Sequence, residues 1–165
     1  MITLEPAGAA DLDYIMATER LPGYEALVGR WERAHHEAAM ADDRHAYFIA
    51  RDDDRCVGFA ILRDWASRER VTHLKRIAVS TTDRGVGKGM LRLIISRVFG
   101  DNNGHRLWLG VFPENARARR AYEQAGFCAD GIARRNAFFG GVYRDELIMA
   151  VLRSEWEATS APPRP

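Results

Sequence analysis

A glycine-rich segment, Arg84-Gly85-Val86-Gly87-Lys88-Gly89, lies between an apolar run that ends at Val79 and a helical pattern that begins near Gly87. Glycine lets the backbone come close to a ligand, and the free N–H groups at the start of a helix favour an anion. A phosphate-bearing molecule is therefore the expected ligand of this loop. A simple turn between strand and helix is the competing interpretation, because glycine runs alone are weak evidence.

Two common phosphate-binding patterns do not fit this segment. A nucleotide P-loop would need glycine at the position of Thr82 and serine or threonine at that of Gly89. A dinucleotide-binding fingerprint would need its third glycine where Met90 stands, and it normally follows the first strand of its unit. Hydrolysis of ATP or GTP and nicotinamide redox chemistry are therefore disfavoured.

Hydrophobic periodicity predicts the elements that would position the loop. Apolar residues predict a strand over 71–79, and an almost wholly apolar run predicts a buried central strand over 107–112. A helical stripe follows each of these strands, over residues 90–99 and 118–125. Asn115 is the expected N-cap of the second helix.

The remaining pattern adds further strands and one longer helix. A strand is expected over residues 2–5, a hairpin over 47–62, and two closing strands near 131–138 and 146–152. Apolar residues at spacings of three and four predict an amphipathic helix from Tyr24 to Met40. We therefore expect one α/β domain with a central mixed sheet.

Length and composition are typical of a single globular domain. The 165 residues are 47% hydrophobic and 28% charged, and the formal net charge of +1 gives no broad field for nucleic acid or an anionic membrane. Cys56 and Cys128 form no disulfide framework and are expected to be small buried residues in a reducing compartment. Neither a signal peptide nor an apolar membrane span is recognisable, so a cytoplasmic location is expected.

Two signatures resemble those of one enzyme family. Arg84-x-x-Gly87-x-Gly89 after residues 74–79 resembles the acetyl-coenzyme A loop of the GNAT N-acetyltransferase superfamily. Residues 109–118 followed by 121–127 are similar to its second signature, an Asn before a helix that carries Tyr and ends in Gly-Phe. Because both occur in the right order and on the right elements, the resemblance is specific.

The resemblance covers residues 2–156 and is weakest over 12–45, where the family builds its acceptor site. The closing stretch, 131–145, is most similar to the subgroup of ribosomal-protein N-terminal acetyltransferases and spermidine acetyltransferases. A GNAT-like domain over residues 1–158 is implied, with a twisted mixed sheet of about seven strands flanked by helices. A disordered tail is expected over 159–165, which lack core-forming residues.

The resemblance also implies how acetyl-coenzyme A binds, with no metal involved. Backbone N–H groups would hold the pyrophosphate, Lys88 would add its charge, and the pantetheine arm would pair with one strand where it splays from the next. Asn115 would bond the arm or the thioester end, and Arg117 on the following helix would meet the ribose phosphate. The implied cofactor-binding residues are Ile77, Ala78, Val79, Arg84, Gly85, Val86, Gly87, Lys88, Gly89, Asn115, Arg117 and Tyr122.

Acetyl transfer to an amine needs a general acid and a general base. Tyr122 matches the family position of the acid, although packing in the core is the alternative for it. Many relatives carry a basic carboxylate on the strand that here holds Gly110, so the base is open. Glu19 is the favoured base, while Glu32, His36, His73 or a water chain ending on a backbone carbonyl are the alternatives. Glu19 is expected at a helix end with little packing to lose, so Glu19→Gln should keep the melting temperature.

The acceptor amine is expected to contact residues 12–40, with Glu19, Tyr24 and Trp31 shaping or charging its pocket. For Trp31, packing in the core is at least as good an interpretation. We expect an N-acetyltransferase that acts on a peptide N-terminus or a small amine, a polyamine being the alternative. A non-catalytic coenzyme A sensor is the rival from another class. No nucleic-acid or membrane partner is expected, and a homodimer stays open.

Overall fold

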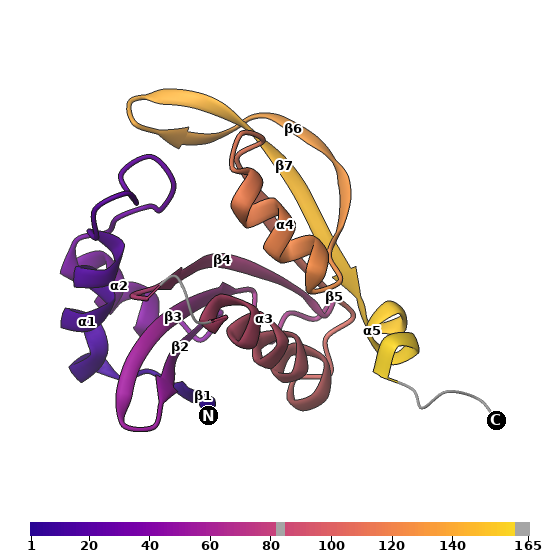
Figure 1. Ribbon diagram of the computed structural model, residues 1–165, viewed down its shortest axis with the longest axis horizontal. Helices are drawn as coiled ribbons and strands as arrows, with labels where there is room; N and C mark the ends of the chain where they lie inside the picture. Colours follow the sequence, from indigo (N-terminus) through magenta and orange to yellow (C-terminus); the bar gives the residue numbers. More distant parts are fainter. Residues whose placement is uncertain (82–84, 161–165) are drawn as a thin grey trace.

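The structure, a computed structural model, describes residues 1–81 and 85–160 and is built around a seven-stranded mixed sheet (Figure 1). The strand order is β1-β2-β3-β4-β5-β7-β6, in which β4 and β5 are parallel and the other neighbours antiparallel. The strands are β1 (Ile2–Pro6), β2 (His45–Asp52), β3 (Arg55–Arg63), β4 (Val71–Val79), β5 (Arg106–Val111), β6 (Cys128–Phe139) and β7 (Val142–Leu152). This confirms the expected α/β architecture.

Helices cover both faces of the sheet. They are η1 (Ala9–Asp11), α1 (Leu12–Glu19), α2 (Arg33–Ala41), α3 (Val86–Ser96), the π-helical turn η2 (Arg97–Asp101), α4 (Ala116–Gln124) and α5 (Arg153–Ser160). Side chains of α3 and α4 pack in one hydrophobic cluster with the sheet, and those of α1 and α2 pack in a second. Among the described residues, no helix is long and apolar enough to cross a membrane.

Strands β4 and β5 separate soon after they begin. They pair only from Val71–Arg106 to His73–Trp108, so the second half of β4 has no β5 partner. Just past this point, Leu62 pairs with Leu74 and Ile61 with Arg76, which leaves Lys75 as the extra residue of a β-bulge. A bulge bends its strand, and it therefore accounts for the direction in which β4 leaves β5.

The helix expected from Tyr24 to Met40 was wrong in its first half. Only α2 is helical, and residues 21–32 form a loop that projects toward the β6–β7 hairpin (Figure 1). Side chains hold this backbone in place of helical hydrogen bonds, since the Trp31 amide donates to Glu19 and the Trp31 carbonyl accepts from Arg20. Gly29 lies so close to Arg76 that a Cβ would be 2.5 Å from its guanidinium.

Three smaller expectations also need correction. The helix expected over residues 90–99 was predicted to end at Gly100, but it continues through η2 to Asp101. Helix α5 includes Thr159 and Ser160, which were expected in a disordered tail. Trp156 packs on the core, and its carbonyl accepts a hydrogen bond from the Thr159 hydroxyl. Residues 161–165 of the expected tail lie outside the described residues. Cys128 is exposed and Cys56 is half-buried, so neither is a buried core residue.

Candidate active site

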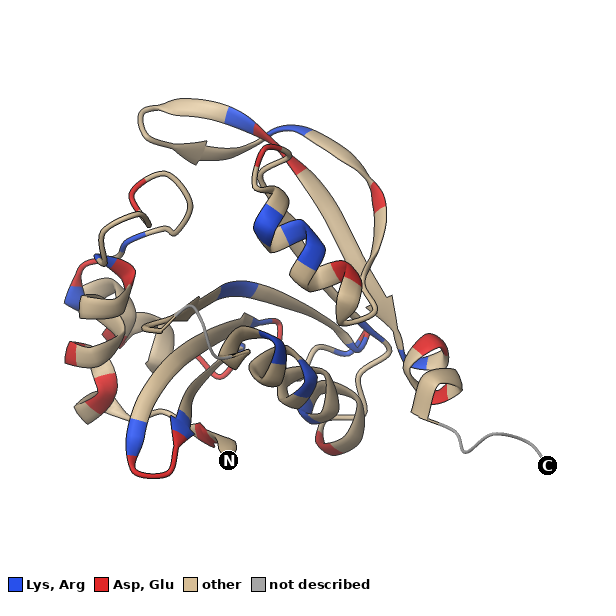
Figure 2. Cartoon of the chain, in the orientation of Figure 1, with Lys and Arg blue, Asp and Glu red and all other residues tan. Residues whose placement is uncertain are grey.

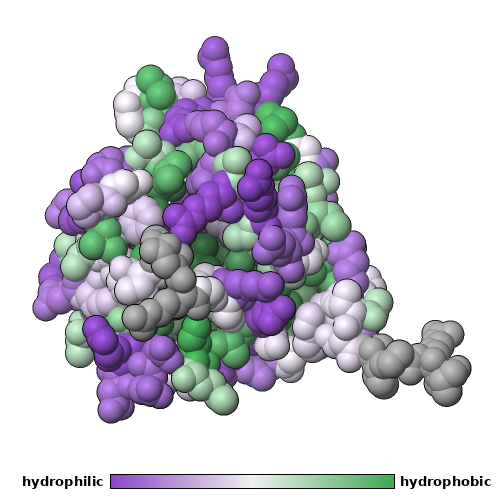
Figure 3. All heavy atoms as spheres, in the orientation of Figure 1, coloured by the Kyte–Doolittle hydropathy of each residue, from purple (hydrophilic) through white to green (hydrophobic). Residues whose placement is uncertain are grey.

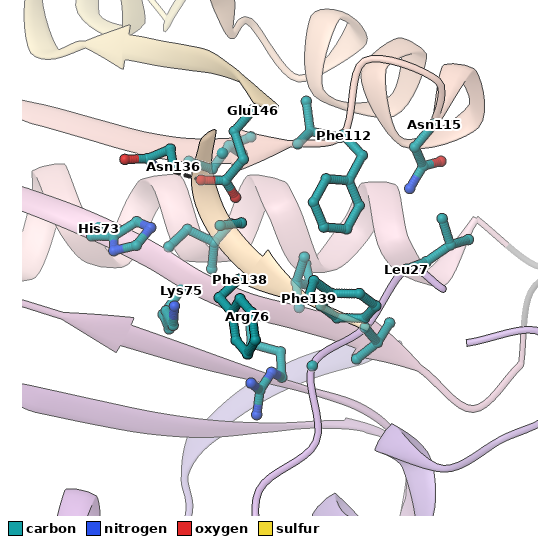
Figure 4. A pocket seen from close by; sticks show the side chains of 18 of the residues that line it. Leu27, His73, Lys75, Arg76, Phe112, Asn115, Asn136, Phe138, Phe139 and Glu146 are labelled. Atoms are coloured by element: carbon teal, nitrogen blue, oxygen red, sulfur yellow. Dashed lines mark hydrogen bonds between the residues drawn. The ribbon is translucent and has the colours of Figure 1, made fainter. Parts of the chain in front are cut away.

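The gap between β4 and β5 opens into a cavity of about 780 Å³. Loop 21–32, the diverging parts of β4 and β5, the start of α4 and the β6–β7 hairpin surround it (Figure 4). On the face of the molecule in Figure 3, hydrophilic side chains surround hydrophobic ones that are recessed near its centre. The polar residues that line the cavity include Glu25, Arg30, Arg63, His73, Lys75, Arg76, Asn115, Tyr122, Asn136 and Glu146.

The described part of the glycine loop, from Gly85 to Gly89, forms the start of α3. Gly85 has a φ of +68°, a left-handed conformation that glycine adopts without strain. Gly89 packs against β1, where a Cβ would lie 3.1 Å from Ile2. Above Gly87 the space is open, since a Cβ there would meet only Val79, at 4.0 Å. Arg84 lies outside the described residues.

Helix α3 therefore presents amide groups to an open space. The first N–H groups of a helix have no partner within the helix, and here they belong to Gly85, Val86, Gly87 and Lys88. Together with the partial positive charge of the helix start they suit a pyrophosphate. Basic residues lie along both α3 and α4 (Figure 2). Arg117 is exposed on α4, and the neighbouring Arg119 donates to the Pro113 carbonyl.

Asn115 and Tyr122 both line the cavity from α4. The side-chain oxygen of Asn115, Oδ1, accepts a hydrogen bond from the Ala118 amide at 3.2 Å, which confirms the expected helix cap. Tyr122 packs beside Phe127, with 5.8 Å between ring centres, and burial raises its pKa to about 12. Within the described part of the chain its hydroxyl has no hydrogen-bond partner, so at neutral pH it is a protonated donor free to serve a ligand.

Tyr24 and the end of β4 are placed together. The Tyr24 hydroxyl donates to the Val79 carbonyl at 2.7 Å and so fastens loop 21–32 to the strand. Tyr24 does not line the cavity, whereas Ile77 and Trp31 do. Trp31 was expected either in the acceptor pocket or packed in the core, and it contributes to both surroundings. It lines the cavity, and the Arg76 guanidinium lies over its ring, 4.6 Å from the centre.

Glu19 is not at an exposed helix end, contrary to expectation. Its side chain is 0% exposed and lies outside the cavity lining, with Arg76 at 2.5 Å and the His36 ring nitrogen at 3.2 Å. Burial raises the pKa of Glu19, but the hydrogen bond from His36 and the charge of Arg76 outweigh it and lower the pKa overall. A buried carboxylate with these partners, outside the cavity lining, is poorly placed to take a proton from an amine in the cavity.

The other candidate bases are no better placed. His36 is fully buried between Glu19 and the Tyr47 hydroxyl, and Glu32 lies outside the cavity lining. His73 does line the cavity, stacked on Trp108 with 3.8 Å between ring centres. Burial, with the charges of Arg63 and Lys75, lowers the pKa of His73 to about 3, so its ring is a very weak base.

Glu146 is the carboxylate that the sequence did not reveal. It points into the cavity from β7, and Asn136 donates to its Oε2 at 2.7 Å (Figure 4). Gly110 on β5 pairs with Ile148, two residues along β7, and a Cβ on Gly110 would lie 2.7 Å from the Glu146 carboxylate. The side chain of Glu146 thus fills the space next to Gly110. Only the β5–β7 register, which local patterns do not contain, could have pointed to it.

Comparisons with known proteins agree with this architecture. The chain matches the Acetyltransferase (GNAT) family over residues 13–127. It is 27% identical over 145 residues to a probable N-acetyltransferase, YjcK, of Bacillus subtilis, which covers 84% of this chain and 79% of the relative. Over 74 residues it is 35% identical to the spermidine N(1)-acetyltransferase of Vibrio cholerae, 42% of this chain and 43% of that one.

Solved structures share the whole fold. The N152L mutant of the Vibrio cholerae spermidine N-acetyltransferase SpeG superposes with a TM-score of 0.83 at 20% identity, covering 97% of this chain and 98% of that one. The same organism's enzyme in complex with CoA and spermine gives 0.82 at 21% identity, covering 94% and 97%.

The open β4–β5 pair, the glycine-bearing helix start and the Asn–Tyr helix define an acetyl-coenzyme A-dependent acyltransferase. The chain belongs to the GNAT acetyltransferase family, and it is an N-acetyltransferase that moves acetyl from acetyl-coenzyme A to an amine. Among the described residues, no group of three or more His, Cys, Asp or Glu side chains is arranged to hold a metal ion.

Proposed function

We propose that Glu146 is the general base of this enzyme and Tyr122 its general acid. The observation that carries the proposal is the Glu146 carboxylate, which lines the cavity beside Gly110 and is held on one oxygen by Asn136. Its second oxygen is left to accept a proton. Glu19, paired and buried, is assigned instead to holding Arg76 and loop 21–32 in place.

The geometry of the α3 start fits the co-substrate, as judged from the free amides and the open face of Gly87. Acetyl-coenzyme A supplies a thioester whose carbonyl carbon forms the new C–N bond while its C–S bond breaks. Gly85, Val86, Gly87 and Lys88 would hold its pyrophosphate, and Ile77 and Ala78 its pantetheine arm. Arg84 remains a proposal for the pyrophosphate, and Arg117 remains one for the ribose phosphate.

Glu146 and Tyr122 account for the protons that move in this scheme. Glu146 accepts a proton from the acceptor ammonium and passes it to solvent, which frees the nitrogen lone pair for attack. After attack it accepts the second proton from the same nitrogen, so that a neutral amide forms. Tyr122 donates its phenolic proton to the departing sulfur and is reprotonated from solvent. A phenol with a raised pKa holds its proton until a strong base such as a thiolate develops beside it.

The charges of the cavity favour a peptide N-terminus or another small amine over a polyamine. Among the described lining residues, the basic side chains Arg30, Arg63, Lys75 and Arg76 face only two acidic ones, Glu25 and Glu146. A polyamine carries several positive charges and needs acidic partners along its length, which this lining does not supply.

The test is a Glu146→Gln variant assayed for thioester consumption with an accepted amine. Loss of the base should lower turnover by about 10² to 10⁴ and remove the acidic limb of the pH–rate profile, while coenzyme A affinity stays the same. Glu69→Gln, at an exposed carboxylate outside the cavity, is the matched control. A Glu146→Gln enzyme with wild-type turnover and pH profile would remove Glu146 from the mechanism.

The rival function, a coenzyme A sensor without catalysis, predicts binding of coenzyme A and no amine-dependent thiol release. A cytoplasmic location and a homodimer stay proposals. The homodimer is supported by exposed aromatic side chains on the β6–β7 hairpin, where the Phe138 and Tyr143 rings lie 5.0 Å apart at the edge of the sheet. Light scattering of the wild type and of Tyr143→Ser measures the mass directly.

A further inference from the structure

The acceptor cavity has two walls of opposite charge. Glu146 and its partner Asn136 lie on the hairpin wall, and His73 and Lys75 lie on the β4 wall across from them (Figure 4). Arg63 from β3 lies beside the β4 wall and influences both of these side chains electrostatically. The site therefore separates one carboxylate from a group of cationic and hydrogen-bonding side chains.

Lys75 carries a charge that no carboxylate of the described residues contacts directly. As the extra residue of the β4 bulge it is exposed to the cavity, and it forms no ion pair among the described residues. Arg76, next to it, is neutralised by Glu19, and Arg63 has only a distant contact of 3.9 Å with Asp64. Burial and the charges of Arg63 and Arg76 lower the pKa of Lys75, and the Glu146 carboxylate on the hairpin wall offsets this only in part.

His73 provides an independent indication of a ligand. Its side chain is 8% exposed, it lines the cavity, and its buried Nδ1 has no hydrogen-bond partner in the described structure. Buried polar atoms are almost always paired, so such an atom beside a cavity is explained by a ligand group that binds there. A neutral imidazole presents one N–H donor and can bond an anion without adding charge.

We propose that the acceptor is a primary amine that also carries an anionic group, a carboxylate or one of similar shape, with the amine at Glu146 and the anion at Lys75. This rests on the proposed function, because it uses Glu146 as the base. Arg63 and His73 flank the anion, and the hydrophobic side chains Leu27, Phe112, Phe138 and Phe139 are left for the body of the substrate. The substrate class is thus a zwitterionic amine and not a polycation.

The experiment compares matched amines that differ in one anionic group. The pairs are L-phenylalanine and its amide, O-phosphoethanolamine and ethanolamine, and the dipeptides Asp-Ala and Asn-Ala, with spermidine added. We expect kcat/KM of the wild type to favour the anionic member of at least one pair by about tenfold or more, since charge-assisted hydrogen bonds are the strong ones. Which pair responds identifies a carboxylate, a phosphate or a peptide as its source.

Variants of Lys75 assign that preference to the β4 wall. Lys75→Gln should abolish the preference through KM of the amine, and Lys75→Glu should reverse it, with KM for acetyl-coenzyme A unchanged. Arg92→Gln, which removes an exposed charge on α3 outside the cavity lining, is the control and should keep the preference. The inference is overturned if the anionic group helps in no pair, or if Lys75→Gln weakens both members equally.

Failure of the proposed function has a different result. In that case Glu146→Gln would keep wild-type turnover and pH profile, or no amine of the panel, spermidine included, would release thiol from acetyl-coenzyme A. Calorimetric titration of the same pairs into the coenzyme A complex still decides the inference there, because binding of the anion at Lys75 needs no chemistry. Tighter binding of an anionic member that depends on Lys75 supports it, and equal binding of both members refutes it.

Discussion

Tyr122 carries a hydroxyl that serves no described neighbour, and this makes its removal informative. Tyr122→Phe leaves no buried partner unsatisfied, so the melting temperature and coenzyme A affinity should match the wild type. Turnover should fall by about 10² to 10⁴, as expected when a general acid is lost. Single-turnover rates of thiol release measure the chemical step apart from product release. Unchanged rates would reduce Tyr122 to a packing residue beside Phe127.

The sequence located Tyr122 and Asn115 because their signature is local, a cap followed by a helix. The base could not be found in the same way. Glu19 looked exposed because the chain positions that bury it, Arg76 and His36, are distant in sequence and meet it only in the folded state. Glu146 had no local signal, since its relation to Gly110 arises from strand pairing.

At the scale of elements, the start of α3 provides a direct test of co-substrate binding. A side chain at position 87 would meet only Val79, at 4.0 Å, so Gly87→Val should fold while its methyl groups occupy the open face of the helix start. We expect coenzyme A affinity to fall by at least about tenfold, or 1.4 kcal/mol. Calorimetry on the folded variant measures this. Equal affinity in the two proteins would place the pyrophosphate elsewhere.

Loop 21–32 is held over the cavity by Arg144 of β7. The Arg144 guanidinium donates to the Ala26 carbonyl at 3.2 Å, pairs with Glu114 and lies over the Phe112 ring. Arg144→Ala should free the loop and raise KM for the acceptor by about tenfold, or 1.4 kcal/mol, with KM for acetyl-coenzyme A unchanged.

Trypsin provides a second measurement, because Arg30 lies in this loop and should be cleaved faster in Arg144→Ala than in the wild type. Arg144→Lys keeps the charge without the forked geometry and should behave in between. Cleavage at an unchanged rate would show that Arg144 does not restrain the loop. Apolar spacing had predicted a helix here, and the polar contacts of Arg20, Glu19 and Arg144 explain why a loop forms instead.

For the whole molecule, the buried group of Glu19, Arg76, His36 and Tyr47 links α1, β4, α2 and β2. Sequence analysis alone expects Glu19→Gln to keep the melting temperature. The structure reverses this expectation, because the variant would leave the Arg76 charge buried without compensation. We expect the free energy of unfolding to fall by about 3 to 5 kcal/mol, measured by urea denaturation. Glu69→Gln is the exposed control, and equal stability of all three proteins would contradict the assignment.

The pH dependence of this contribution follows from the lowered pKa of Glu19. A carboxyl whose folded pKa lies below its unfolded value stabilises the fold above the unfolded pKa, about 4.3, and loses this effect as pH falls through the folded pKa. His73, with a pKa lowered to about 3, also destabilises the fold as pH falls below its ordinary value. The contribution of Glu19 is therefore measured as the difference in the free energy of unfolding between wild type and Glu19→Gln. This difference should shrink only in acid.

The strands and most helices could be expected from periodicity and turn residues, because the sheet buries apolar runs that each lie within one segment. The strand order comes from the folded chain. The parallel β4–β5 pair follows from the helix between its strands. The bulge at Lys75 and the register of β7 depend on contacts between segments, and only the folded chain reveals them.

The contact between Gly110 and Glu146 limits which substitutions can occur at these two positions during evolution. A side chain at position 110 and the carboxylate at 146 would compete for one volume, since a Cβ at 110 already lies 2.7 Å from Glu146. Neither position can enlarge unless the other shrinks, so the two must change together as the family diverges. In an alignment of relatives, chains with an acidic residue at the counterpart of 110 should carry a smaller one at that of 146. A lineage with a carboxylate at position 146 could then acquire one at position 110 only through an intermediate that has a carboxylate at neither position.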